Sequence, residues 1–428
     1  MPGSKIAEIH LSLNRQGASS YAKTSYPIRY GRYHELRYGD YLVQCNLRGE
    51  VKYIMSRHAD WPHPSEWLKR SEGGNWIYYS TGGYYSGVFD LLGEYYLPCL
   101  GYPSNNLSSE NPFSLHAVKR ALATSEELTV RADYALSIAA ASKRKVEERQ
   151  FLRHLACTGG NYYSRKKERL DSILGAEISV LPPDSRHVDY EVVPLIIADG
   201  CLYHCDFCSV KADRGFRRRS RSDIGRQLRG VVEYYGADLV NCNSLFLGQL
   251  DSLAANNDDI LYAASEAYRI LNFPKSLLRQ PRLFLFGSVG AILEKDESFW
   301  AALDKLPFTS FINLGLESFD RQTLSLLGKP LSPEMVEASF QRALQVNRRF
   351  PNIEISVNVV LGENLPTGHR SSLQEFLGKP SADGWGKMTV YCSPLCGSAD
   401  NRKSLLAQFR QLKRQSSYDI WLYLIQRL

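Results

Sequence analysis

The chain has 428 residues, of which 44% are hydrophobic and 23% are charged. This composition is that of an ordinary globular protein and excludes a fibrous or largely disordered chain, and the length is sufficient for two domains. No apolar run approaches the roughly 18–20 residues that cross a bilayer, and the N-terminus lacks the apolar core of a signal peptide, so we expect a cytoplasmic protein with no membrane partner. The net charge of +7 permits an anionic partner without requiring one.

The first half of the chain, residues 1–186, is rich in Trp, Tyr, Gly and Pro and is predicted to form a separate α+β domain. Residues 42–54 predict a hairpin that turns at Arg48-Gly49, and a helical stretch is expected over about 114–155. The tyrosines of this half could line a ligand groove. We favour a core role, because aromatic side chains fill cores and Tyr tolerates half-exposed sites.

The second half, residues 187–428, alternates short β-branched runs with helical segments. Repeated strand–helix units predict a parallel sheet with right-handed crossovers. Six such units predict an α/β fold, a partial TIM-like (β/α)₆ barrel whose chemistry gathers at the C-terminal ends of the strands. We expect strands at residues 192–198, 244–248, 282–287, 310–317, 353–362 and 388–392, and helices at 257–272, 289–305, 332–349 and from the last strand to Leu428.

Local signals mark the ends of two of these helices. Ser222 is predicted to cap the helix that follows the first strand, with Asp223 near its positive end. Pro333 at the start of the 332–349 helix and Pro351 beyond its end suit those boundaries.

Three of the nine cysteines lie within the stretch DGCLYHCDFC, directly after the first predicted strand. Disulfides are rare in the cytosol, so clustered cysteines there are ligands or catalysts more often than staples. Three thiolates on one short loop can hold three corners of a cubic iron–sulfur cluster, and the fourth iron then keeps an open coordination position. The alternative is a zinc site that uses His204 or a distant ligand. Zinc modules usually present two separated pairs of ligands, and no second pair follows at a suitable spacing.

The spacing Cys-x₃-Cys-x₂-Cys, with an aromatic residue before the third cysteine, resembles the radical S-adenosylmethionine (SAM) enzymes. The resemblance covers residues 191 to about 400. It implies that Cys201, Cys205 and Cys208 ligate a [4Fe–4S] cluster whose open iron chelates the amino and carboxylate groups of SAM, and that Phe207 lies on the adenine side.

Later segments extend the resemblance. The sequence NLGLESFDRQTLSLLGKP (313–330) is similar to that of coproporphyrinogen-oxidase-like and Elongator-like members, although FLGQLDSL departs from the family's commoner glycine-rich turn. Lys329 stands where relatives often carry arginine; it keeps the charge but loses the two-pronged geometry. The resemblance implies these further SAM contacts: Gly248 and Gln249 at the amino group, Glu317, Ser318 and Lys329 at the ribose and carboxylate, and Asn358, Leu361 and Gly362 at the adenine.

The resemblance also implies a reaction. An electron from the reduced cluster would cleave SAM into methionine and a 5′-deoxyadenosyl radical, which abstracts hydrogen from a substrate that the sequence does not identify. The electron would come from a donor such as flavodoxin or ferredoxin. An arginine-rich segment at 210–229 could dock that acidic donor, bind an anionic substrate, or simply be a solvated helix face.

Two other interpretations remain at this point. One is a zinc-stapled RNA-binding module without catalysis, in which the arginines of 210–229 bind the nucleic acid. The other is a second cluster that uses Cys392 and Cys396 with Cys242 or Cys157. We do not favour a second cluster, because complete auxiliary clusters generally need more closely spaced cysteines.

Overall fold

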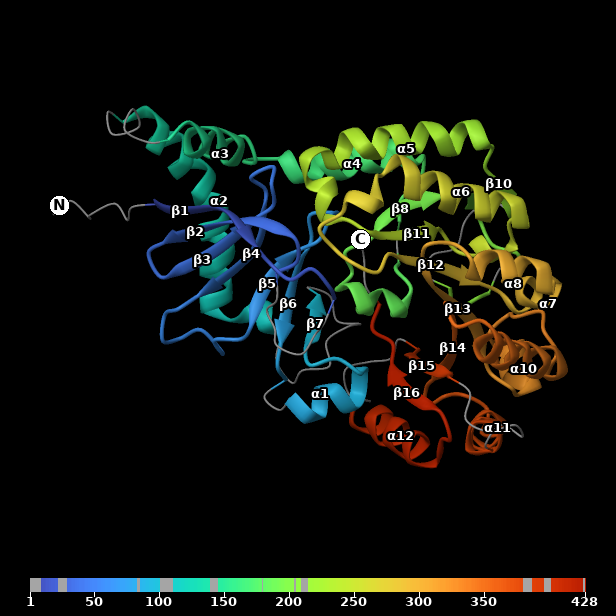
Figure 1. Cartoon of the computed structure of the whole chain (residues 1–428). Coiled ribbons are helices and arrows are strands. Elements are labelled where there is room, and N and C mark those ends of the chain that lie inside the picture. The colour runs from blue at the N-terminus through green and yellow to red at the C-terminus, as the bar shows by residue number, and fades with distance from the viewer. Residues whose placement is uncertain are drawn as a thin grey trace.

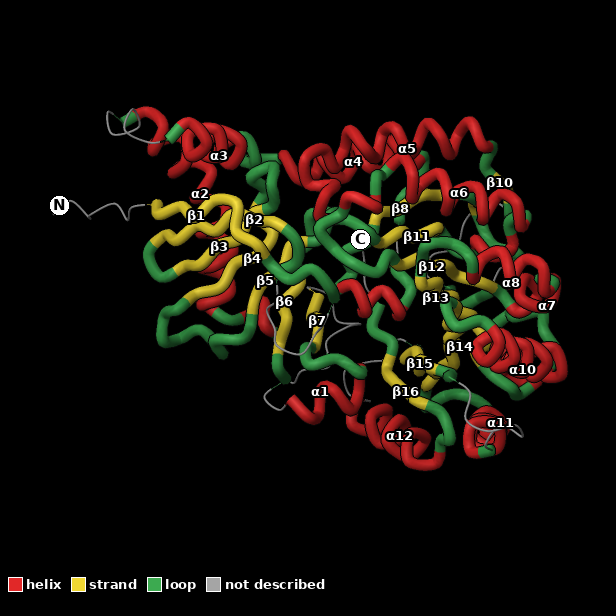
Figure 2. Tube along the Cα trace, in the orientation of Figure 1, coloured by secondary structure: helices red, strands yellow, loops and turns green. Residues whose placement is uncertain are grey.

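The computed structural model describes residues 9–21, 29–82, 85–100, 111–138, 145–178, 180–203, 205–208, 215–379, 387–395, 402–425 and 428. Two seven-stranded sheets lie side by side in these residues, one antiparallel and N-terminal, the other parallel and C-terminal (Figures 1 and 2). One continuous hydrophobic core contains residues of both sheets. None of the described helices combines the length and apolar character that a membrane span needs.

The antiparallel sheet is a meander in which each strand pairs with the next. The predicted hairpin at 42–54 is confirmed as β3 and β4. β4 and β5 are buried along their whole length, so their side chains do not alternate between apolar and polar. The strands are β1 (Ile9–Gln16), β2 (Arg32–Tyr38), β3 (Tyr41–Cys45), β4 (Val51–Ser56), β5 (Trp67–Arg70), β6 (Trp76–Ser80) and β7 (Leu97–Leu100).

Four helices belong to this half of the chain. The helical stretch expected over 114–155 is present as two helices, and α2 packs against β4 and α3. Tyr53, Tyr78, Tyr79 and Tyr96 are buried, which agrees with a core role for these four, whereas Tyr95 is exposed. The helices are α1 (Tyr85–Leu92), α2 (His116–Ser137), α3 (Val146–Ala156) and α4 (Tyr162–Leu174), with a short 3₁₀ turn η2 (Pro112–Ser114).

The parallel sheet follows the order of the chain from β8 to β16. All six predicted strands are present, and in the described residues no pairing joins β8 to β16, so the sheet is open. Nearly every residue of the central strands is buried, as expected for strands covered on both faces. The strands are β8 (Val193–Ile196), β11 (Ser244–Gly248), β12 (Arg282–Gly287), β13 (Thr309–Glu317), β14 (Ile353–Leu361), β15 (Thr389–Pro394) and β16 (Asp419–Leu422).

Helices lie along the outside of the parallel sheet (Figure 1). They are α5 (Arg221–Tyr235), α6 (Asn257–Ile270), α7 (Val289–Glu294), α8 (Glu297–Asp304), α9 (Arg321–Leu326), α10 (Pro333–Arg349), α11 (Thr367–Gly378) and α12 (Arg402–Gln415). Short elements connect them: β9 (Ala198–Asp199), β10 (Arg217–Arg218), η4 (Pro183–Val188), η5 (Gly236–Asn241), η6 (Ser252–Ala254) and η7 (Phe273–Lys275).

Three expectations were wrong in detail. The C-terminal helix ends at Gln415, and a seventh strand, β16, follows and pairs in parallel with β15. The segment expected as one helix at 289–305 is two helices, because Asp296 accepts the N–H of Phe299 and caps a new helix.

The N-cap of α5 also lies two residues earlier in the chain than expected. Ser220, not Ser222, accepts the N–H of Asp223 at 3.2 Å, and the Ser222 hydroxyl lies 2.9 Å from that of Ser220. The start of α10 agrees with the sequence, since Pro333 is its first residue and Ser332 caps it. The boundary predicted after residue 186 falls inside η4 and stays a prediction.

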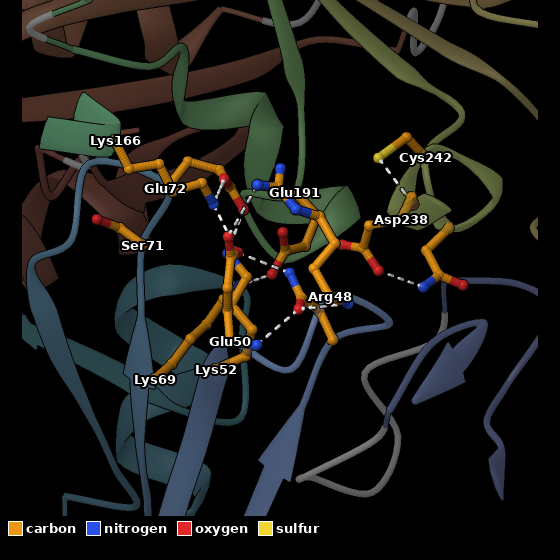
Figure 3. A network of polar contacts seen from close by, with 12 residues as sticks. Arg48, Glu50, Lys52, Lys69, Ser71, Glu72, Lys166, Glu191, Asp238 and Cys242 are labelled. Carbon is orange, nitrogen blue, oxygen red and sulfur yellow. Dashed lines mark hydrogen bonds and ion pairs between the residues drawn. The ribbon is translucent and has the colours of Figure 1, made fainter. Parts of the chain in front are cut away.

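A buried ionic network lies where the antiparallel sheet meets the rest of the chain (Figure 3). The Lys166 ammonium lies 2.6 Å from Glu50 and 3.0 Å from Glu72, and Lys52 also pairs with Glu72. Neighbouring Lys166 and Lys52 hold the pKa of Glu72 well below its usual range despite its burial. Removing one partner would leave an uncompensated buried charge, so the network makes the relative placement of β4, β5 and α4 specific.

Asp238 of η5 joins this interface to the parallel-sheet half. Its Oδ1 accepts the backbone N–H of Leu47 at 3.2 Å and the amide of Asn241 at 2.9 Å. Asn241 in turn exchanges two hydrogen bonds with the backbone of Arg32. Burial raises the pKa of Asp238 to about 6.

We therefore predict that Asp238→Asn raises thermal stability at alkaline pH. The folded-state pKa of about 6 lies above the unfolded value of about 3.9. Below about pH 3.9 the carboxyl is protonated in both states and does not lower the free energy of unfolding. As the pH rises from about 3.9 to about 6, its ionisation lowers that free energy progressively, and the loss is complete above about 6. The asparagine keeps Oδ1 as the acceptor. The gain in free energy of unfolding, measured by denaturant unfolding, should be about 2 kcal/mol larger at pH 8 than at pH 4.5. Equal stability of both proteins at pH 8 would contradict the assignment.

Candidate active site

A cavity of about 530 Å³ opens at the C-terminal ends of the parallel strands. This is the edge at which the sequence places the chemistry. Every strand of the sheet contributes to its lining, either with its last residues or with the loop that follows it. The polar and ligand residues of the lining are Cys201, Tyr203, Cys205, Cys208, Asp251, Ser288, Glu317, Lys329, Asn358 and Ser393.

The three loop cysteines all line this cavity. Cys205 is buried, and Cys201 and Cys208 are half-buried. Burial raises the pKa of the Cys201 thiol to about 11 and raises that of Cys205 as well. Thiolates at these positions therefore need a compensating positive charge, which a bound metal supplies.

The zinc alternative named His204 as a ligand, and His204 lies outside the described residues. Elsewhere in the described part of the chain, Asp184, His187 and Glu354 have ligand atoms that all lie within 4.8 Å of one another.

Glu317 and Lys329 form an ion pair inside the cavity. The Lys329 ammonium lies 2.9 Å from Glu317 Oε1 and donates to the carbonyl of Gly315 at 2.5 Å. Both residues are 7% exposed. A register shift between Gly315 and Glu317 and a positive φ of 67° at Glu317 form an irregular end to β13. Such bulges re-aim side chains next to active sites.

Asp251 is a cavity residue that the sequence reasoning missed. It follows β11, is 2% exposed, and its Oδ1 accepts the N–H of Ser288 at 3.0 Å. Its Oδ2 is buried and has no hydrogen-bond partner among the residues that the structure describes. Burial raises the pKa of this carboxyl to about 6. The available signal was the single acidic residue in FLGQLDSL, three positions after Gly248.

The other residues assigned to SAM by resemblance divide into two groups. Phe207 and Asn358 line the cavity; Phe207 is 38% exposed, and Asn358 exchanges hydrogen bonds of 2.6 and 3.0 Å with Asn313. The remaining residues are not part of the described lining: Gly248, Gln249, Ser318, Leu361 and Gly362. Their roles stay predictions.

Two of that second group have other partners. The Gln249 amide donates to the carbonyl of Glu177 at 2.5 Å. The buried Ser318 hydroxyl lies 2.8 Å from Nδ1 of His369 and accepts the N–H of Asp320. Both side chains therefore already make hydrogen bonds within the chain.

The arginine-rich segment is largely paired within the chain. Arg219 donates to Asp199 and Asp223, and Arg217 also contacts Asp199, so these arginines fasten the chain after the cysteine loop to β9. Arg226 pairs with Asp223. Among the cysteines that could serve a second cluster, Cys392 is buried, Cys157 is exposed and Cys396 lies outside the described residues.

Comparison with solved structures gives weak likenesses. A cobalamin-dependent S-adenosylmethionine radical enzyme, OxsB, shares 14% identity at a TM-score of 0.35 over 55% of this chain and 32% of its own. A radical SAM methyltransferase from Sphaerobacter thermophilus shares 14% sequence identity at a TM-score of 0.35, over 53% of this chain and 64% of its own. Methylornithine synthase (PylB) shares 11% sequence identity at a TM-score of 0.31, over 63% of this chain and 65% of its own. At these TM-scores the likenesses carry no argument.

Comparison by sequence carries the assignment. No curated protein matches the chain. The sequence model of the Radical SAM superfamily matches residues 195–371, which run from β8 and the cysteine loop through β14 into α11. Residues 195–371 are therefore a radical SAM domain.

Proposed function

We propose that the chain binds a [4Fe–4S] cluster through Cys201, Cys205 and Cys208 and cleaves SAM reductively in the cavity at the strand ends. A single observation carries the proposal: three thiols, a buried carboxylate with one oxygen unpaired among the described residues and a buried ammonium converge on one cavity. When bound, the cluster supplies the electron that breaks a C–S bond of SAM.

Asp251 and Lys329 offer complementary charges to the two ends of an amino acid. The free Oδ2 of Asp251 lacks a donor, and an ammonium group in the cavity would supply one. The Lys329 ammonium has three N–H donors, of which Gly315 and Glu317 take two. The third can bind a carboxylate oxygen. We therefore assign Asp251 to the methionyl amino group of SAM and Lys329 to its carboxylate.

The rest of the cavity wall is mostly apolar. Leu250, Phe286, Val360, Leu395 and Tyr423 line it together with the polar groups. A bound substrate in such a cavity is shielded from water, which protects a reactive intermediate from side reactions and strengthens every charge interaction inside. We propose that the substrate presents its reacting C–H bond to this wall.

The fold and the supply of electrons complete the proposal. The open sheet with helices outside supports an incomplete (β/α) barrel of the kind expected for residues 187–428. We propose a cytoplasmic enzyme that receives its electron from a small acidic donor such as flavodoxin or ferredoxin. Arg218 supports this docking, because it is exposed on β10, which pairs with the strand directly before the cysteine loop.

We predict that Cys205→Ala abolishes cluster assembly. After anaerobic reconstitution, the wild type should hold about four irons per chain with broad visible absorption, whereas the variant loses one of three ligands and should hold less than one. Cys157→Ala removes an exposed cysteine at the C-terminal end of α3, and this variant should hold as much iron as the wild type. Colourless wild-type protein with one zinc per chain would favour the RNA-binding alternative instead.

We predict that Asp251→Asn weakens SAM binding to the cluster-loaded protein by about 10- to 100-fold, the range for a lost hydrogen bond between charged groups. Asparagine keeps Oδ1 for the Ser288 N–H but places a neutral side chain opposite the amino group. The matched control is Asp258→Asn, at an exposed carboxylate in the first turn of α6. Equilibrium dialysis with labelled SAM measures both. Unchanged affinity in Asp251→Asn would refute this role.

A further inference from the structure

We propose that Gly328 is a positioning residue, because the turn at 327–329 seats the cysteine loop and places Lys329 in the cavity at the same time. This inference rests on the proposed function. It adds that the contact of Gly328 with Asp206 contributes to the distance between the cluster and the carboxylate-binding ammonium.

The turn holds the loop through its backbone. The N–H of Asp206, between Cys205 and Cys208, donates to the carbonyl of Leu327 at 2.9 Å. Gly328 then presses against the same residue: a Cβ placed on it would lie 2.4 Å from Asp206 Oδ2 and 2.8 Å from its Cγ. The same Cβ would lie 3.2 Å from the backbone nitrogen of Asp206, so a side chain there displaces the Asp206 carboxylate and also crowds the backbone of the loop.

The conformation of the turn also requires glycine. Gly328 has φ +64°, in the left-handed region that other residues adopt at a cost. The next residue is Lys329, whose ammonium reaches Glu317 and the carbonyl of Gly315 across the cavity floor. One three-residue segment, 327–329, thus contacts the loop that binds the cluster through Leu327 and Gly328 and carries the cation that binds SAM at Lys329.

A second attachment holds the other interval of the loop. Tyr203, between Cys201 and Cys205, accepts the backbone N–H of Gly290 on its hydroxyl at 3.0 Å, at the start of α7. Each interval between consecutive cysteines therefore contains one anchor, Tyr203 to the β12–α7 turn and Asp206 to the 327–329 turn. With the Tyr203 anchor fixed, a displacement at Asp206 would tilt the loop rather than shift it as a whole.

The consequence is a specific defect for Gly328→Ala. The three thiols remain, so iron should still assemble at near wild-type content. Because the added methyl group crowds both the carboxylate and the backbone nitrogen of Asp206, we expect the loop to shift relative to Lys329, so that SAM can no longer contact the cluster and the ammonium together. We expect a loss of at least tenfold in SAM affinity, and little of the change that SAM normally causes in the EPR spectrum of the reduced cluster.

Two further variants separate this contact from general backbone strain. Gly160→Ala places a methyl group at an equally left-handed position (φ +60°) with open space around it, and it should behave as wild type. Asp206→Ala/Gly328→Ala removes the atoms that the new methyl group would strike, and it should recover most of the SAM-dependent EPR change.

The outcomes are distinguishable from those of the proposed function. If wild-type protein assembles no cluster or shows no spectral response to SAM, the proposed function fails. If wild type responds and Gly328→Ala responds equally, the positioning role is overturned. If Gly328→Ala is defective and the double variant is no better, the contact with Asp206 is not the cause, which also overturns the inference.

Discussion

The site depends on one electrostatic constraint: three thiols line one cavity, and burial disfavours the charged form of two of them, Cys201 and Cys205. A thiolate at either of these two positions needs a neighbouring positive charge. We propose that an iron–sulfur cluster bound by the three cysteines supplies that charge. The rest of the cavity is arranged around this loop.

The parallel sheet explains why the remaining groups meet there. Parallel strands end at one edge, so residues far apart in sequence, such as Asp251, Glu317 and Asn358, line one cavity without any special loop. Between them they combine an unpartnered carboxylate, an ion pair and apolar walls. This is the combination that a zwitterionic amino acid group and an apolar reaction chamber require.

The sequence predicted the parallel strands well because strands covered on both faces appear as unbroken apolar runs. It also identified the cysteine loop, where close spacing constrains the chemistry strongly. β16 was missed because its four residues follow a long polar helix with only a short connection. Asp251 was missed because a lone carboxylate after a strand carries no pattern. Its significance comes from burial and an unpaired oxygen, which only the three-dimensional structure shows.

The most direct test of the central claim is product analysis. Anaerobically reconstituted protein, reduced with dithionite and given SAM, should release 5′-deoxyadenosine and methionine in equal amounts. Protein that carries a full cluster and leaves SAM intact under these conditions would contradict the account.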